Sequence, residues 1–146
     1  MTGKLAVITG AGGGLGRALA RELSKRGIPV AGIGRDVSSL DETGTGCAGP
    51  FHPVLADMAD PEQVADAFDR IDAIGAPDIL INNAAAYPRR DFLDETPESF
   101  ARTMNTNLGG VVAATHEALL RMVRQNLHFP STHLSTPPFQ IYCREW

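Results

Sequence analysis

Five of the seven residues from Gly10 to Gly16 are glycines, and this composition suits a loop that holds phosphate groups. A glycine has no Cβ atom, so the backbone can approach a pyrophosphate closely. The free N–H groups at the start of a following helix favour a bound anion. Gly10, Gly14 and Gly16 fit the pattern T-G-x-x-x-G-x-G, which is close to the G-x-G-x-x-G dinucleotide fingerprint but spaced differently. The turn predicts a nucleotide site; an ordinary flexible loop is the alternative.

The residues on either side of the turn favour a nucleotide site. Before it, residues 5–8 form a short apolar run that is typical of a buried strand. After it, a helix is predicted from about Gly14, and Gly27 can end that helix in a left-handed conformation. The expected buried face of this helix consists of Leu15, Ala18, Leu19, Ala20 and Leu23. A strand, a glycine turn and a helix in this order predict a nucleotide-binding βα unit.

Arg35 follows the second predicted strand, residues 28–34, where the choice of cofactor could be made. In a dinucleotide-binding fold an acidic residue at this strand end binds the ribose 2′-hydroxyl, whereas an arginine accommodates a 2′-phosphate. Gly34 leaves the acidic position empty, and a guanidinium suits a phosphate because it offers paired donors. We therefore expect NADP as the cofactor, with NAD as the alternative. A solvated arginine beside Asp36 in a surface turn is the simpler explanation.

Two further strand ends carry polar side chains. Asp57 ends the third predicted strand, which begins at Phe51, and it could meet an adenine ring or cap a turn. The fourth strand begins at Asp78 and leaves through Asn82-Asn83-Ala84-Ala85, where small residues let the backbone meet a ligand. Turn formation is the alternative role of these asparagines. Residues 37–50, between the second and third strands, are rich in glycine and are predicted to form a loop.

Three more helices are predicted. Asp60 and Pro61 mark the start of one whose apolar face is formed by Val64, Phe68 and Ile71. Thr96 opens the next, which is expected to turn Phe100 and Met104 inward. Residues 105–110 are expected to interrupt the helical pattern, and a long helix then runs to about residue 125. Its expected buried face consists of Leu108, Val111, Val112, Thr115, Leu119, Met122 and Val123.

Four strands alternating with helices predict an α/β fold with a doubly wound parallel sheet of the Rossmann type. The length of 146 residues allows one such domain. We expect residues 1–124 to form the NAD(P)-binding domain and residues 125–146 to form an irregular tail.

The composition of the chain argues against several kinds of partner and cellular location. The net charge of −4, without a basic stripe, argues against a nucleic-acid partner. The sequence contains no apolar run of membrane-spanning length, and its N-terminal apolar run is too short for a signal peptide. Cys47 and Cys143 have neither the spacing of metal ligands nor that of a redox pair. We therefore expect a cytoplasmic protein with reduced cysteines and no metal site.

The motifs together resemble the short-chain dehydrogenase/reductase family. The resemblance rests on Thr9-Gly10-x-x-x-Gly14-x-Gly16, on Asp57, on Asn82-Asn83-Ala84-Ala85 and on Asn107 in Thr-Asn-Leu-Gly-Gly, in the family's order and spacing. It covers residues 4 to about 124 and departs at Ala85, where the family has glycine. It implies cofactor contacts from Thr9, Gly10, Gly12, Gly13, Gly14, Leu15, Gly16, Arg35, Asp57, Met58, Asn83, Ala84 and Ala85.

The resemblance also implies hydride transfer between a nicotinamide cofactor and a small carbonyl or alcohol substrate. Catalysis in the family uses a serine together with Tyr-x-x-x-Lys, because the lysine lowers the pKa of the tyrosine that moves the hydroxyl proton. An asparagine helps to hold a proton-relay water, and Asn107 is the one catalytic residue found here in a matching context. A homo-oligomer is compatible with the resemblance.

From about Gln125 the sequence departs from the family pattern. Tyr142 is followed four residues later by Trp146 instead of lysine, and a tyrosine without that neighbour is a poor acid–base group at neutral pH. Ser135 or Thr136 could be a remnant of the strand that carries the catalytic serine. We therefore expect the cofactor-binding part of an oxidoreductase, truncated before Tyr-x-x-x-Lys and inactive alone.

A sheet of about four strands would have two structural consequences. The fourth strand would be an exposed edge, and the long helix would keep an exposed apolar face, so we expect low stability. A non-catalytic protein that binds a nucleotide, or that binds a partner through this edge and helix, is the alternative function.

Overall fold

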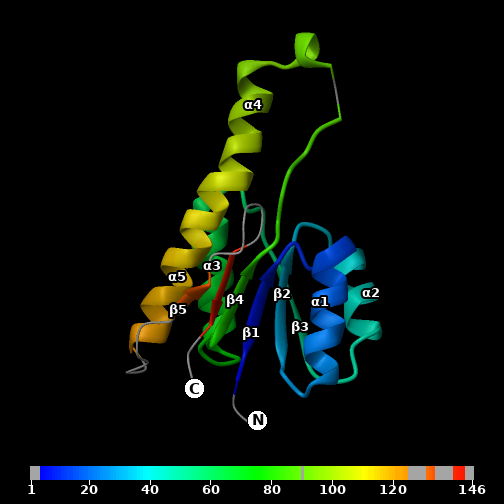
Figure 1. Cartoon of the computed structure of the whole chain (residues 1–146), viewed down its shortest axis with the longest axis vertical. Helices are drawn as coiled ribbons and strands as arrows, with labels where there is room; N and C mark the ends of the chain where they lie inside the picture. The colour runs from blue at the N-terminus through cyan, green and yellow to red at the C-terminus, as the bar shows by residue number, and fades with distance from the viewer. Residues whose placement is uncertain (1–3, 90, 125–130, 134–139, 144–146) are drawn as a thin grey trace.

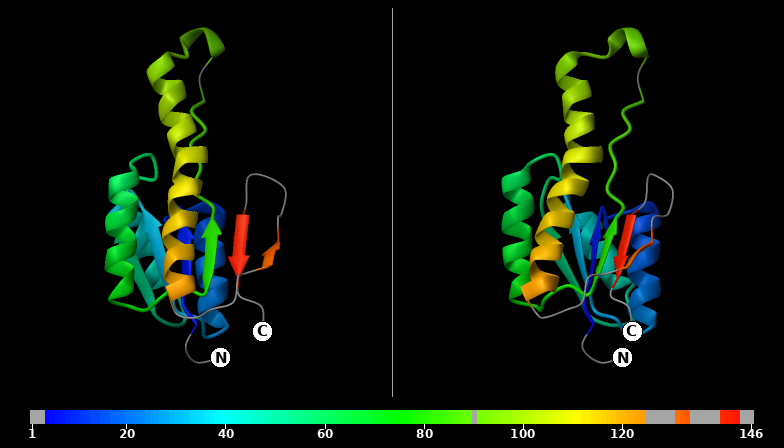
Figure 2. Two further views of the ribbon diagram at one scale, coloured as in Figure 1. Left: turned by 90° about the vertical axis from the view of Figure 1, so that its left-hand side faces the viewer. Right: turned by 60° about the vertical axis from the view of Figure 1, so that its left-hand side comes forward.

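The computed structural model describes residues 4–89, 91–124, 131–133 and 140–143 of the 146-residue chain. They form one sheet with helices on both faces (Figure 1). Helices α1 and α2 cover one face, and α3 and α5 cover the other. The helix α4 extends beyond the sheet, as both views of Figure 2 show. No helix within the described ranges is long and apolar enough to cross a membrane.

Four parallel strands form the centre of the sheet. They pair in the order β3, β2, β1, β4, and their bounds are Ala6–Thr9 for β1, Val30–Gly34 for β2, Phe51–Leu55 for β3 and Ile79–Asn82 for β4. Val7 of β1 lies opposite Ala31 of β2 and Leu80 of β4, and all three residues are buried. Helices on both faces bury such strands completely, so β1 and β4 are nearly continuous apolar runs. The predicted doubly wound α/β fold of the Rossmann type is confirmed.

The helices begin at sequence signals that the chain carries locally. Their bounds are Gly14–Lys25 for α1, Val37–Thr45 for α2, Pro61–Asp72 for α3, Pro97–Met104 for α4 and Gly110–Arg124 for α5, with a short 3-10 turn, η1, at Phe92–Asp94. The Asp60 side chain accepts hydrogen bonds from the N–H groups of Glu62 and Gln63 and so caps α3. Thr96 and Ser99 form a capping box at the start of α4. Both predicted helix starts are confirmed.

Two apolar clusters hold the helices against the sheet. The cluster beneath α3 and α5 includes Val7, Ile33, Phe68, Leu80 and Met122. The cluster beneath α1 and α2 includes Ile8, Ala20, Val30, Leu40 and Ile81. Adjacent residues of β1 and β4 thus point to opposite faces, as the pleat of a strand requires.

The loop predicted for residues 37–50 is wrong, because residues 37–45 form α2. The Asp36 side chain caps this helix by accepting a hydrogen bond from the N–H group of Ser39 at 3.0 Å. Leu40 and Thr43 bury one face of the helix against the sheet. The glycines lie at the end of α2, with Gly46 at its C-cap, so they terminate the helix and do not prevent it.

The predicted buried faces of α1, α4 and α5 are only partly correct. In α1 the buried residues are Gly16, Ala20 and Ser24, while Leu15 and Ala18 are exposed. Phe100 and Met104 of α4 are exposed as well. In α5 the buried residues are Gly110, Ala114, Ala118, Arg121 and Met122, and Leu108, Val112 and Val123, predicted to be buried, are exposed.

Between α4 and α5 lies η2, the π-helical turn at Asn105–Gly109. The predicted interruption of the α-helical pattern is confirmed, because this turn separates α4 from α5, although the three segments continue as one rod (Figure 1). A π turn inserts an extra residue into a helix, which rotates the residues before it relative to those after it. Phe100 and Met104 are exposed because α4 extends beyond the sheet, where no strand lies beneath it (Figure 2).

The expectation of an exposed β4 edge is also wrong. β6 (Gln140–Cys143) pairs antiparallel with β4, and β5 (Ser131–His133) pairs antiparallel with β6. The segment expected to be irregular therefore contains two strands, and the backbone groups of β6 satisfy those of β4. Ser135 and Thr136, considered above as catalytic remnants, lie outside the described residues.

Arg121 joins α5 to α3 through an ion-pair network. Its side chain is only 6% exposed, and its guanidinium lies 5.5 Å from the centre of the Phe68 ring. It donates hydrogen bonds to Asp72 at 2.8 Å, to Asp69 at 2.6 Å and to Glu117 at 2.6 Å. Asp69 and Asp72 therefore help to hold α5 against α3.

We predict that Arg121→Gln lowers the free energy of unfolding by about 1–3 kcal/mol, because three carboxylates lose their common partner. Urea unfolding followed by circular dichroism measures this change. Arg124→Gln is the matched control, since Arg124 is an exposed arginine at the end of the same helix. The control is expected to change the value by no more than about 0.5 kcal/mol. Equal effects of the two substitutions would contradict a special role for Arg121.

Candidate nucleotide-binding site

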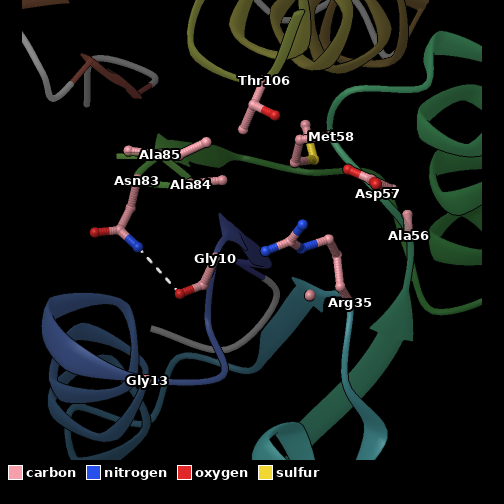
Figure 3. Close-up of a pocket in the computed structure, with 12 residues that line it drawn as sticks. Gly10, Gly13, Arg35, Ala56, Asp57, Met58, Asn83, Ala84, Ala85 and Thr106 are labelled. Atoms are coloured by element: carbon pink, nitrogen blue, oxygen red, sulfur yellow. Dashed lines mark hydrogen bonds between the residues drawn. The ribbon is translucent and has the colours of Figure 1, made fainter. Parts of the chain in front are cut away.

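A cavity of about 270 Å³ lies at the carboxyl ends of the parallel strands. Ligands of open α/β sheets bind at this edge, near the point where the strand order reverses. Here that point is β1, whose neighbours β2 and β4 continue the sheet in opposite directions. The cavity is shown in Figure 3, and its lining consists of Gly10, Gly13, Gly34, Arg35, Ala56, Asp57, Met58, Asn83, Ala84, Ala85, Ala86 and Thr106.

The glycine turn forms one wall of the cavity because it packs directly on the backbone that follows β4. Gly10 has a φ of +69°, and a Cβ atom there would lie 2.8 Å from the Cα atom of Ala84. A Cβ atom on Gly16 would collide with the carbonyl oxygen of Gly10 and would lie 2.5 Å from Nδ2 of Asn83. Only glycine fits at these two positions.

Thr9 and Asn83 hold the glycine turn against the backbone after β4 with four hydrogen bonds. The Oγ1 atom of Thr9 accepts hydrogen bonds from the N–H groups of Asn83 and Ala84, each at 3.0 Å. The Nδ2 atom of Asn83 donates to the carbonyl oxygens of Thr9 at 3.0 Å and Gly10 at 3.1 Å. Figure 3 shows the Asn83 amide directed at the turn. Both side chains therefore position the wall of the cavity.

The start of α1 offers backbone donors at the same wall. Gly13, the N-cap residue, has extended backbone, and no side chain caps it. The first turn carries no acidic residue, so the positive end of the helix dipole is not compensated there. A Cβ atom built on Gly13 would meet no atom within 4 Å, which leaves open space in front of these N–H groups. This donor set fits a diphosphate.

Arg35 supplies a positive charge to the cavity. It is exposed, and Figure 3 shows its guanidinium directed into the space between the turn and Met58. It forms no hydrogen bond or ion pair with the described residues. Asp36 is not its partner, because that carboxylate accepts hydrogen bonds from Ser38 and Ser39 at the start of α2. These bonds lower the pKa of Asp36.

Asp57 supplies the negative charge. Its Oδ2 atom accepts a hydrogen bond from Arg102 at 2.6 Å, and its Oδ1 atom accepts one from the N–H group of Ala59 at 3.0 Å. Burial raises the pKa of Asp57, but these two hydrogen bonds and the charges of Arg102 and Arg35 outweigh burial and hold the pKa below its ordinary value. The carboxylate is therefore ionised at neutral pH. The Asp57 side chain thus caps a turn, which was one of its two expected roles. The other role, a contact with adenine, stays a prediction.

Asn107 lies in η2, away from the cavity lining. Its Oδ1 atom accepts a hydrogen bond from the N–H group of Ala86 at 2.7 Å, and its Nδ2 atom donates to the carbonyl oxygen of Ala86 at 2.9 Å. The side chain thus ties the segment after β4 to the helical rod. Its expected role in holding a catalytic water stays a prediction.

The structure brings together eight of the expected cofactor residues: Gly10, Gly13, Arg35, Asp57, Met58, Asn83, Ala84 and Ala85. The others, which lie near the cavity but outside its lining, are Thr9, Gly12, Gly14, Leu15 and Gly16. The expectations missed Gly34, Ala56, Ala86 and Thr106. Gly34, Ala56 and Ala86 are chain neighbours of predicted residues at strand ends, so the strand end itself was their signal, whereas Thr106 lies in η2 beside Asn107.

The described residues contain no cluster of three or more histidine, cysteine, aspartate or glutamate side chains that could hold a metal ion.

We predict that Gly16→Ala lowers the free energy of unfolding by about 1–3 kcal/mol, because the added methyl group forces the turn away from Asn83. The matched control is Gly13→Ala, at an extended position with open space around it. Its cost should stay below about 1 kcal/mol, the scale of a weaker N-cap. Both values come from urea unfolding. A Gly16→Ala protein as stable as the parent chain would show that the close approach is not required.

Comparisons with known proteins agree with this geometry. Residues 4–127 match the family model described as short chain dehydrogenase. L-xylulose reductase from Mesocricetus auratus is 35% identical over 150 residues, which cover 98% of this chain and 60% of that protein. The chain thus spans about 60% of the length of the L-xylulose reductases that it matches over most of its own length.

Two solved structures are similar in fold and in sequence. A short-chain type dehydrogenase/reductase from Mycobacterium marinum is 31% identical, with a TM-score of 0.78 over 95% of this chain and 61% of that one. A short chain dehydrogenase from Burkholderia cenocepacia J2315, solved in complex with NADP, is also 31% identical, with a TM-score of 0.76 over 81% of this chain and 50% of that one. The present chain therefore belongs to the short-chain dehydrogenase family of oxidoreductases.

Proposed function

We propose that this chain binds NADP(H) in the cavity at the carboxyl edge of the sheet. It would be the cofactor-binding part of an oxidoreductase for a small carbonyl or alcohol substrate. The observation that carries the proposal is Arg35, whose guanidinium forms no hydrogen bond within the described part of the chain and is directed into a cavity whose wall is a glycine turn at the start of a helix (Figure 3). The relative from Burkholderia cenocepacia that was solved in complex with NADP supports the same class of ligand.

Each residue has a part in this binding. The backbone of Gly10 and Gly13 and the start of α1 hold the diphosphate, because they offer N–H groups without side chains in the way. Arg35 pairs with the 2′-phosphate. Asp57 and Met58 lie at the end of β3 and face the adenosine. Asn83 and Thr9 hold the glycine turn in place, and the bound cofactor supplies or accepts the hydride.

We further propose that the 146 residues bind the cofactor without turning over substrate. Neither Tyr87 nor Tyr142 is followed by lysine four residues later, so the acid–base pair that the family uses is missing from this sequence. Asn107 would then act only as a positioning residue, through its two hydrogen bonds to Ala86. A cytoplasmic location and a homo-oligomer stay predictions.

We predict that calorimetric titration gives saturable binding of NADPH, with NADH about 10–100-fold weaker. Arg35→Ala should reduce this difference by weakening NADPH about tenfold or more, because one charge-assisted contact contributes about 1.5–3 kcal/mol. Arg89→Ala is the control, since Arg89 is exposed and lines neither this cavity nor the one beside it.

Two results would contradict the proposal in different ways. A folded chain that binds neither NADPH nor NADH would rule out a cofactor site. Equal affinities for the two cofactors, unchanged by Arg35→Ala, would leave the site but remove the preference for NADP.

A further inference from the structure

A second cavity, of about 340 Å³, adjoins the nucleotide cavity. It lies between the segment that follows β4 and the helix α4, and its lining consists of Arg35, Ala85, Ala86, Tyr87, Pro88, Ser99, Arg102 and Thr103. Arg35, Ala85 and Ala86 line both cavities, so Arg35 stands at their junction. A ligand group that reaches Arg35 in the first cavity is therefore also at the border of the second.

Arg102 brings a second guanidinium to this junction from α4. Its Nη2 atom lies 2.6 Å from Oδ2 of Asp57, and its side chain is 59% exposed. It forms no other side-chain hydrogen bond with the described residues, so most of its donors are available. Nothing in the sequence near Arg35 or Asp57 indicates this residue, which lies 45 positions beyond Asp57.

The charges at the junction do not balance. The charged side chains in the two linings are Arg35, Asp57 and Arg102, which together carry one excess positive charge. The Asp57 carboxylate interacts with both arginines, and they contribute to its lowered pKa. An ion pair as exposed as that of Arg102 contributes little to stability, so a more strongly charged anion can recruit this guanidinium. A phosphate monoester carries about 1.5–2 negative charges at pH 7 and is such an anion.

We propose that Arg102 and Arg35 together bind the 2′-phosphate of NADP(H), which makes Arg102 a specificity-determining residue contributed by α4. This inference rests on the proposed function. Arg35 would contact the phosphate from the end of β2, and Arg102 would contact it from α4, since both side chains line the second cavity. The capping box of Thr96 and Ser99 fixes the start of α4, and η2 fixes its end, so the helix presents Arg102 in a defined place.

The test compares ligands that differ by this phosphate alone. Calorimetry at constant low ionic strength measures the affinity of the 146-residue chain for NADPH and NADH, and for the fragments 2′,5′-ADP and 5′-AMP. Arg102→Gln should weaken NADPH and 2′,5′-ADP about tenfold, the effect of one charge-assisted hydrogen bond. It should change NADH and 5′-AMP less than about twofold, because these ligands offer Arg102 no phosphate.

Two further variants control for charge and for folding. Arg102→Lys keeps the charge but not the planar fork, so its loss for NADPH should be smaller than that of Arg102→Gln. Arg89→Gln removes an exposed arginine from the segment between β4 and α4 and should change all four affinities less than about twofold. Thermal unfolding of every variant, followed by circular dichroism, establishes that each is folded.

Each contrary result has its own meaning. Equal losses for all four ligands in Arg102→Gln would overturn the inference, because they would show that Arg102 only supports the fold of the site. An unchanged NADPH affinity in Arg102→Gln, with a clear loss in Arg35→Ala, would overturn the inference and leave the proposed function intact. A folded parent chain that binds none of the ligands would overturn both.

Discussion

The close packing of the glycine turn against the backbone after β4 is the constraint on which the site depends. Gly10 and Gly16 have no room for a Cβ atom, and the side chains of Thr9 and Asn83 satisfy backbone groups on both segments. The parallel pairing of β1 with β4 sets the distance between them. Because the turn leads directly into α1, the same contact fixes where the positive end of that helix points.

Features with a local physical cause could be predicted from the sequence. Apolar runs marked the four parallel strands, and Asp60 and Thr96 marked two helix starts, because capping involves residues only two or three positions apart. The helix α2 could not be predicted from composition, since burial of Leu40 and Thr43 against the sheet stabilises it in spite of its glycines. Phe100 and Met104 of α4 were expected to be buried because their spacing is helical, but α4 extends beyond the sheet (Figure 2), and no local pattern in the sequence indicates this.

The candidate site was predictable to the same extent. Arg35, Asp57 and Asn83 follow different strands, and parallel strands place their carboxyl ends at one edge, so the sequence alone brought these residues together. Contacts between distant elements had no such signal. The ion pair of Arg102 with Asp57, the hydrogen bonds of Asn107 to Ala86 and the pairing of β6 with β4 each join segments that no local pattern connects.

Charge, more than shape, distinguishes the ligands that such a cavity can take. Gly34 removes the acidic side chain that would accept a ribose hydroxyl, so Asp57 is the one carboxylate that lines the two cavities. Asp57 stays ionised because the donors around it outweigh its burial, and its single charge cannot neutralise both Arg35 and Arg102. A ligand that ends in a hydroxyl group would leave this positive excess uncompensated, whereas the negative charge of a phosphate would more than offset it. Selectivity between two cofactors of nearly equal shape can therefore arise from the net charge of the cavity lining. Arg35 after β2, Asp57 after β3 and Arg102 on α4 each contribute to that charge.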